Sequence, residues 1–138
     1  MDSQVINVLS IEDNPGDALL IQERLVGVEP ARWGRPQFEL EWVDTLTKGL
    51  TRLSDAASGK AKRIDAVLTD LDLPDSQAGE TFTILREHFP HLPIVVLTGR
   101  EDEELAIQSV RAGAQDYLFK AEATSALLAH AITYAIER

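Results

Sequence analysis

Polar residues end several short apolar runs of this sequence, at positions where a parallel α/β sheet keeps its chemistry. Glu12 and Asp13 end the first run, and Asp70 ends a later one. Thr98 and Lys120 end two further runs. Because the carboxyl ends of parallel strands meet at one edge of a sheet, we expect these side chains to lie close together. Three acids, a hydroxyl and an amine in one crevice predict a site for a divalent metal ion and a phosphoryl group.

Each residue type in this set suits one part of magnesium-dependent phosphoryl chemistry. Mg²⁺ prefers hard oxygen ligands, so Asp13 and Asp70 can bind it directly, and Glu12 either directly or through water. A carboxylate can also attack phosphorus and become an acyl phosphate. Lys120 offers a positive charge and Thr98 a hydroxyl, and both can stabilise the charge on a transferring phosphoryl group.

The elements that must position these residues alternate along the chain between short apolar runs and segments of helical period. Such alternation predicts parallel βαβ units and an α/β fold with a doubly wound sheet. Strands are predicted over 5–11, 38–43, 66–70, 94–98 and 116–119, and helices after the turn at 14–17, over 45–57, 79–88 and 101–112, and from about 124 onward.

The apolar residues of the helical segments predict which faces pack on the sheet. Leu19, Leu20 and Leu25 are expected to form the core face of the first helix, and 127–136 carries an apolar stripe. The long connections 28–37 and 54–63 are interpreted as solvated loops rather than recognition surfaces, because loops vary freely in such folds.

Composition excludes several classes of function. A length of 138 residues is ordinary for one domain with its own core. The net charge of −10 argues against direct binding to a nucleic-acid backbone, and the lack of cysteine excludes disulfides and thiol chemistry. No apolar stretch has membrane-spanning length, and the first four residues lack the basic start of a secretory signal. We expect a cytoplasmic protein that binds no membrane.

Four motifs in this order and spacing resemble the receiver domain of two-component response regulators, over nearly the whole chain. The motifs are "IEDNPGD" with Glu12 and Asp13, "LTDLDLPD" with Asp70, "PIVVLTG" with Thr98, and "GAQDYLFK" with Tyr117 and Lys120.

The resemblance implies a role for each residue around the site. Asp70 would accept a phosphoryl group, with Mg²⁺, from the phosphohistidine of a histidine kinase or from a phosphotransfer protein. The backbone carbonyl of Asp72 would complete the metal site formed with the acid pair. The backbone amides of Leu71 and Gly99 would hold phosphoryl oxygens. The domain would act as a switch and would not turn over an external substrate.

Two further pairs of residues are expected to govern the phosphorylated state. The resemblance implies that Thr98 and Tyr117 form a switch pair, in which the threonine moves inward and the tyrosine becomes buried. In the receiver-like geometry Asp72 and Arg100 overhang the mouth of the site, where we expect an ion pair that screens the approach of water. Such an exposed pair stabilises the fold little, but it can bias access.

The resemblance also implies the architecture and the partners. It implies a flavodoxin-like (βα)5 domain with five parallel strands in the order 2-1-3-4-5. Residues 1–138 would be a single receiver domain, either alone or as the N-terminal part of a longer protein with a C-terminal output domain. From the apolar stripe of the last helix we further expect that the last two helices and the last strand form a homodimer face, which phosphorylation favours. One residue departs from the family pattern, since Ala121 follows Lys120 where many receivers have proline.

Two alternatives of different classes stay open. Asp70 and Asp72 could be the aspartate pair of a magnesium-dependent phosphohydrolase, although that pair belongs on a first strand rather than a third. The chain could also be a receiver that only binds proteins. The histidines His88, His91 and His130 are interpreted as surface residues rather than phosphodonors. No GxGxxG follows the first strand, so dinucleotide binding lacks support.

Overall fold

A five-stranded parallel sheet forms the centre of the computed structural model, which describes residues 5–26, 36–77 and 79–137. The strand order is β2-β1-β3-β4-β5, which confirms the predicted flavodoxin-like fold. The strands are β1 (Val5–Ile11), β2 (Gln37–Val43), β3 (Ala66–Thr69), β4 (Ile94–Thr98) and β5 (Asp116–Phe119), and the helices are α1 (Pro15–Leu25), α2 (Leu46–Ala57), α3 (Thr81–His88), α4 (Glu103–Arg111) and α5 (Ser125–Glu137).

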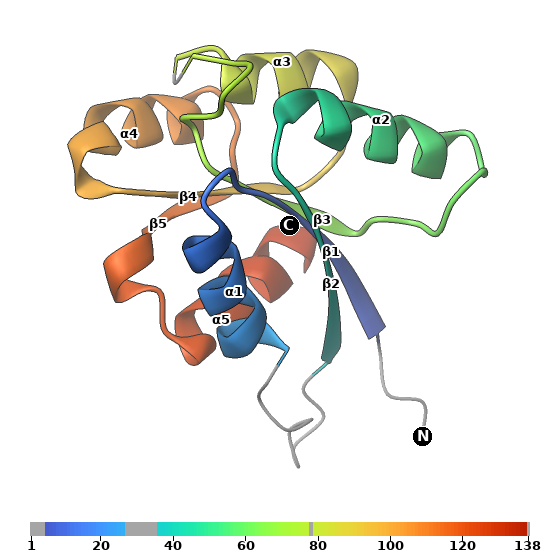
Figure 1. Cartoon of the computed structure of the whole chain (residues 1–138), viewed down its shortest axis with the longest axis horizontal. Helices are drawn as coiled ribbons and strands as arrows, with labels where there is room; N and C mark the ends of the chain where they lie inside the picture. Colours follow the sequence, from blue (N-terminus) through green and yellow to red (C-terminus); the bar gives the residue numbers. More distant parts are fainter. Residues whose placement is uncertain (1–4, 27–35, 78, 138) are drawn as a thin grey trace.

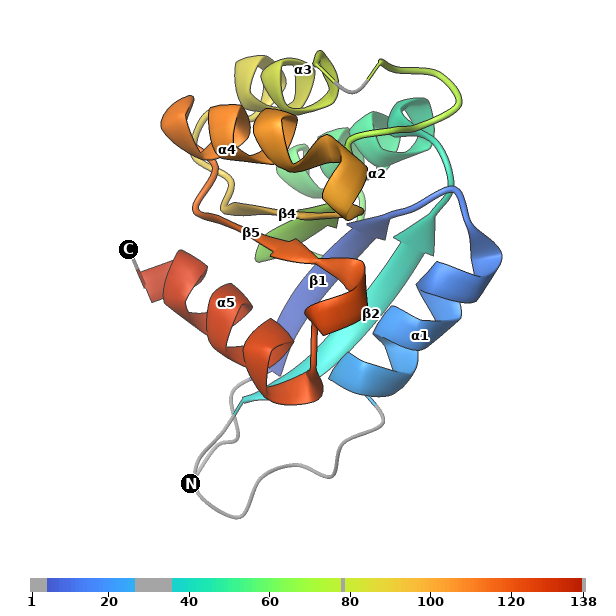
Figure 2. The same cartoon turned by 90° about the vertical axis from the view of Figure 1, so that its left-hand side faces the viewer.

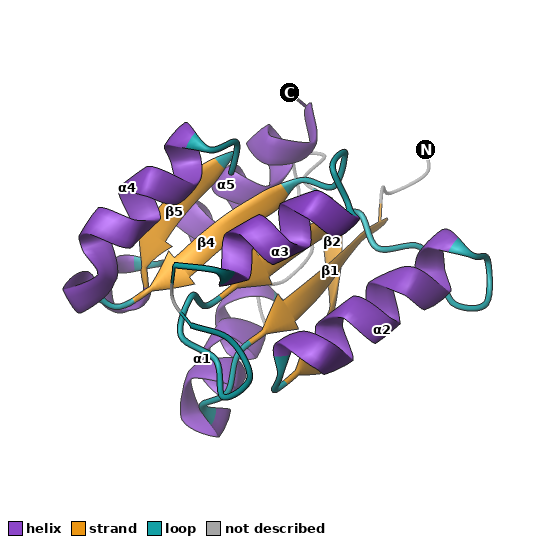
Figure 3. Ribbon diagram, turned by 90° about the horizontal axis from the view of Figure 1, so that it is seen from above, coloured by secondary structure: helices purple, strands orange, loops and turns teal. Residues whose placement is uncertain are grey.

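The helices lie in two layers around the sheet. Helices α1 and α5 cover one face, and α2, α3 and α4 cover the other (Figure 1, and in the perpendicular view of Figure 2). Seen from above in Figure 3, the strands run side by side beneath the second layer, with their arrowheads toward one edge. Every neighbouring strand pair is parallel, so all five carboxyl ends meet there.

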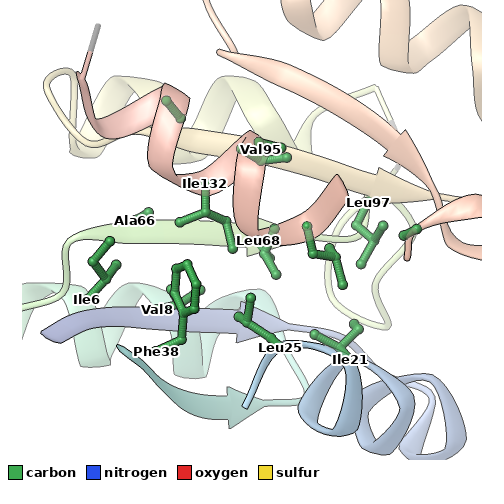
Figure 4. Close-up of a cluster of buried hydrophobic side chains, with 14 residues drawn as sticks. Ile6, Val8, Ile21, Leu25, Phe38, Ala66, Leu68, Val95, Leu97 and Ile132 are labelled. Atoms are coloured by element: carbon green, nitrogen blue, oxygen red, sulfur yellow. The ribbon is translucent and has the colours of Figure 1, made fainter. Parts of the chain in front are cut away.

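Each layer encloses its own apolar core. Between the sheet and helices α1 and α5, Val8 and Leu68 pack with Ile21 and Ile132 (Figure 4). A second cluster, on the side of α2, α3 and α4, contains Leu85 and other fully buried residues. The central strands β3 and β4 are buried along their whole length, which agrees with their continuous apolar sequence.

The helix after the first strand corrects one predicted core residue. Leu19 is 59% exposed, whereas Ala18, Ile21 and Leu25 are buried. These three positions recur at helical spacing, and Leu19 falls outside their face. Leu20 is half-buried. The prediction that Leu19 belongs to the core is therefore wrong, because this residue lies on the solvent side of the helix.

Other differences concern element ends and loops. Strand β3 ends at Thr69, so Asp70 follows the strand rather than ending it. A 3-10 turn, η1 (Arg100–Asp102), precedes α4, and α3 begins two residues later than predicted. Most of the connection 28–37 lies outside the described residues. In the described part of the chain, no helix is long and apolar enough to cross a membrane.

A cap ties the loop after Asp70 to helix α2. The Asp75 carboxylate accepts hydrogen bonds from the amides of Leu46 and Thr47, at 2.8 Å each, and from the Thr47 hydroxyl at 2.6 Å. These amides begin α2 and have no partner inside the helix. Asp75 thus anchors the segment that carries the predicted phosphoacceptor.

Candidate functional site

The five polar residues singled out in the sequence meet at the carboxyl edge of the sheet. Glu12 and Asp13 follow β1, Asp70 follows β3, and Lys120 follows β5. Thr98 is the last residue of β4. These placements follow from the parallel pairing of the four strands, which brings their carboxyl ends together.

The acid pair is held by the turn between β1 and α1 and by the edge strand. The amide of Glu12 donates to the carbonyl of Val43 at 3.0 Å. The indole nitrogen of Trp42 on β2 donates to the carbonyl of Glu12 at 2.6 Å. The side chain of Asn14 caps α1 by accepting from the backbone amide of Asp17. The backbone amide of Asn14 donates to Glu12 Oε2 at 3.1 Å. Glu12 is therefore fixed through both its backbone and its carboxylate.

Three carboxylates form a candidate metal site. Oxygens of Glu12, Asp13 and Asp70 lie within 4.8 Å of one another. Glu12 is 1% exposed and Asp70 is 7% exposed, whereas Asp13 is exposed. Hard oxygen donors of this kind, two buried and one open to solvent, fit a divalent cation that keeps part of its water shell.

Lys120 lies among carboxylates that come from three elements. Its ammonium nitrogen is 2.6 Å from Glu12 Oε1, 2.8 Å from Asp70 Oδ2 and 3.0 Å from Asp17 Oδ2. The sequence reasoning missed Asp17, which lies in the first turn of α1. The available signal was its position four residues after Asp13, at the start of a helix that leaves the same edge of the sheet.

Burial and pairing shift the protonation of this cluster in different ways. Burial, reinforced by the charge of Asp70, raises the pKa of Glu12 from its ordinary value of 4.5 to about 7, although Lys120 and the amide of Asn14 act against it. Burial alone would lower the pKa of Lys120, but hydrogen bonds to Asp70, Glu12 and Asp17 outweigh it and raise that pKa. Lys120 therefore stays charged, whereas ionised Glu12 bears a desolvation cost that its partners do not fully offset.

Hydrogen-bond donors surround the Asp70 carboxylate. The amide of Leu71 donates to Oδ1 at 2.7 Å, and the Thr98 hydroxyl donates to the same oxygen at 3.3 Å. Oδ2 contacts Lys120. Thr98 is fully buried in this structure. Tyr117 is half-buried, and its ring meets the edge of Phe119 at 5.6 Å between centroids.

Gly99 and Asp72, two of the residues predicted to act through their backbone, lie in the loops after β4 and β3. Gly99 directly follows β4, and a Cβ atom there would overlap the carboxylate of Glu101, so this glycine leaves room for that side chain. The amide of Asp72 lies 3.4 Å from Asp70 Oδ1, which places this residue beside the carboxylate. None of the peptide bonds within the described residues is cis, so the Lys120–Ala121 bond is trans.

The expected ion pair between Asp72 and Arg100 is wrong in this structure. Arg100 pairs with Glu122, and its guanidinium carbon lies 4.5 Å from the centroid of the Phe119 ring. Strands β4 and β5 are neighbours, so a residue just after β4 meets residues at the end of β5. Burial, and then the charge of Asp72, raise the pKa of Asp102.

The comparisons with known proteins agree with this fold and site. The family model of the response regulator receiver domain matches residues 32–132. The KDP operon transcriptional regulatory protein KdpE of Escherichia coli is 35% identical over 114 residues, which are 83% of this chain and 44% of KdpE. The swarming motility regulation protein RssB of Serratia marcescens is 30% identical over 117 residues, 83% of this chain and 46% of that protein.

A solved structure supports the same conclusion. The response regulator receiver domain protein of Clostridium thermocellum superposes with a TM-score of 0.76 at 26% identity, covering 96% of this chain and 95% of that one. The chain belongs to the family of response regulator receiver domains, which are signalling domains of two-component systems. It spans less than half the length of the two curated relatives named above.

Proposed function

We propose that this chain is a phosphorylation switch whose acceptor is Asp70. The phosphoryl group would come from the phosphohistidine of a histidine kinase or from a phosphotransfer protein. One observation carries this proposal: the Asp70 carboxylate is 7% exposed and touches Lys120, Thr98 and the Leu71 amide at once. Groups that stabilise a phosphoryl group are therefore already arranged around a single carboxylate.

In the proposed reaction Asp70 forms a new bond to phosphorus. A carboxylate oxygen of Asp70 attacks phosphorus, the phosphorus–nitrogen bond to the donor imidazole breaks, and the imidazole leaves and takes up a proton. Lys120 neutralises a phosphoryl oxygen, and the Thr98 hydroxyl donates to another. The amides of Leu71 and Gly99 would serve the remaining oxygens. Positioning and charge neutralisation account for most of the catalysis in such reactions.

The metal in this proposal is Mg²⁺. Glu12, Asp13, Asp70 and the backbone carbonyl of Asp72 would hold it, and it would supply positive charge to the phosphoryl oxygens. The three clustered carboxylates support this assignment. Hydrolysis of the phosphorylated state would be limited by Asp72 and Arg100, which we place at the mouth of the site as separate groups.

The output is proposed to pass through Thr98 and Tyr117 to the face formed by α4, β5 and α5. Leu127 is 46% exposed and Tyr134 is 49% exposed on α5, so this helix presents apolar surface for a second copy. We propose that phosphorylation favours a homodimer through this face. Residues 1–138 would form one cytoplasmic receiver domain, with a C-terminal output domain where the chain is part of a longer protein.

The phosphohydrolase alternative receives less support from the geometry. Among the described residues, the acids that come together are Glu12, Asp13 and Asp70, and Asp72 is not one of them. Both Asp70 and Asp72 follow β3, the third strand, whereas the aspartate pair of such an enzyme belongs on a first strand. Turnover of an external phosphate ester, measured by phosphate release, would decide for the alternative.

Phosphorylation in vitro tests the proposed function. The native chain, Asp70→Asn and the control Asp55→Asn are incubated with Mg²⁺ and acetyl phosphate, and intact mass is measured. We expect one added phosphoryl group on the native chain and on Asp55→Asn, which removes an acid of α2 far from the site edge. Asp70→Asn should gain none. Phosphorylation of Asp70→Asn to the native extent would refute the assignment.

A further inference from the structure

Asp17 reaches the site from helix α1, and the chemistry proposed above gives it no role. Its Oδ2 atom lies 3.0 Å from the ammonium nitrogen of Lys120, and its side chain is 38% exposed. In the described part of the chain, the acids that can share a metal ion are Glu12, Asp13 and Asp70, without Asp17. Asp17 therefore contacts the lysine while standing outside the candidate metal cluster.

The same helix also holds the main chain of this lysine. Nη1 of Arg24 donates to the carbonyl oxygens of Lys120, at 3.2 Å, and Ala123, at 2.7 Å. Asp17 and Arg24 are two helical turns apart, so they lie on the same side of α1. The cavity left between α1 and the residues around Lys120 measures only about 10 Å³. One side of α1 thus fixes both the ammonium group and the backbone of Lys120.

Lys120 and a divalent cation draw on the same two carboxylates. The ammonium lies against Glu12 Oε1 and Asp70 Oδ2, and both acids belong to the candidate metal cluster. Two positive charges a few ångströms apart repel strongly in a partly buried site. Repulsion from a bound cation therefore favours movement of the ammonium away from these two acids. Asp17 is the carboxylate that remains available to it.

We propose that Asp17 is a positioning residue for Lys120, which it holds beside Asp70 when a divalent cation takes the oxygens of the acid cluster. Arg24 supports this role by keeping the lysine backbone in place. The importance of the lysine rests on the proposed function, but the exchange between ammonium and cation does not involve a phosphodonor. It can therefore be measured by metal binding alone.

A double-mutant cycle on Mg²⁺ affinity tests the inference. Asp17→Asn is made in the native chain and in a Lys120→Met background, and isothermal titration calorimetry with MgCl₂ gives Kd. In the native chain Kd should rise about threefold, because the displaced ammonium loses its remaining carboxylate. In the Lys120→Met background the same substitution should change Kd by less than about 1.5-fold, since only the screened charge of Asp17 is lost.

A matched control distinguishes loss of the contact between Asp17 and Lys120 from loss of a negative charge on α1. Glu23→Gln removes an exposed acid from the same helix and should leave Kd unchanged in both backgrounds. An equal rise for Asp17→Asn in both backgrounds, or no rise in the native chain, would overturn the inference. Circular dichroism checks folding, and Lys120→Gln replaces Lys120→Met where the latter does not fold. Failure of the proposed function would be seen separately, as a native chain that takes no phosphoryl group on Asp70.

Discussion

Replacing Glu12 by glutamine should stabilise the metal-free protein at alkaline pH and leave it unchanged at acid pH. Glu12 is 1% exposed, and burial raises its pKa from 4.5 to about 7. Between these two values the folded protein binds a proton that the unfolded chain has released. The stability contributed by this proton is complete below about pH 4.5 and is lost as the pH rises through 7.

The size of the effect follows from the two pKa values. A difference of about 2.5 between them corresponds to about 3 kcal/mol, which is an upper bound because Glu12 also interacts with Asp70 and Lys120. Glutamine has the shape of the protonated glutamate and can still accept from the Lys120 ammonium. Near pH 5 Glu12→Gln should therefore be more stable than the native chain by less than about 1 kcal/mol. Near pH 8 it should be more stable by up to about 3 kcal/mol.

Urea denaturation in EDTA at pH 5, 6, 7 and 8 measures this difference. The other titrating groups are present in both chains. The effect of Glu12 is therefore read as the difference between the free energies of unfolding of the two chains at each pH. Glu23→Gln, which changes an exposed acid of α1, serves as the control and should run parallel to the native curve at every pH. Parallel curves for Glu12→Gln would refute the reasoning. Saturating Mg²⁺ should reverse the order at pH 8, because ionised Glu12 then has a cation to bind.

Three further predictions concern the metal, the phosphoryl lifetime and the output. Asp13→Asn should weaken Mg²⁺ binding about tenfold by calorimetry, since one oxygen ligand loses its charge; native affinity would exclude this metal site. Asp72→Ala should change the rate of phosphate loss more than Arg100→Ala, because Arg100 pairs with Glu122 rather than with Asp72. Decay of a radiolabelled phosphoryl group measures both rates, and equal effects of the two substitutions would contradict this prediction. Beryllofluoride should raise the sedimenting mass to that of a dimer, and identical mass with and without it would remove the dimer proposal.

The strand ends of this protein could be predicted from sequence because two strong regularities coincide. Central parallel strands are apolar on both faces, so β3 and β4 stand out as continuous runs. Polar residues that follow such runs must lie at one edge of the sheet. Glu12, Asp70 and Lys120 were therefore predicted to meet. In the structure both carboxylates lie within hydrogen-bond distance of the Lys120 ammonium.

The pairing of charges at this edge could not be predicted in the same way. Asp72 and Glu122 both follow strands at the same edge of the sheet as Arg100. Their positions in the sequence do not indicate which of them pairs with Arg100. The ring of Phe119 lies beneath the guanidinium and favours the second partner. Exposed ion pairs differ by less than about 1 kcal/mol, so small packing contacts decide among them.

The carboxylates of the site surround a cation that the chain itself supplies, the ammonium of Lys120. Glu12 and Asp70 would repel each other across the edge of the sheet, and burial would increase that repulsion. The ammonium of Lys120 lies 2.6 Å from Glu12 Oε1 and 2.8 Å from Asp70 Oδ2 and offsets that repulsion. At the proposed metal site, binding of Mg²⁺ would then be an exchange with this ammonium for the charges of the two carboxylates. Such an exchange requires an alternative partner for the lysine, and Asp17 lies 3.0 Å away, outside the metal cluster.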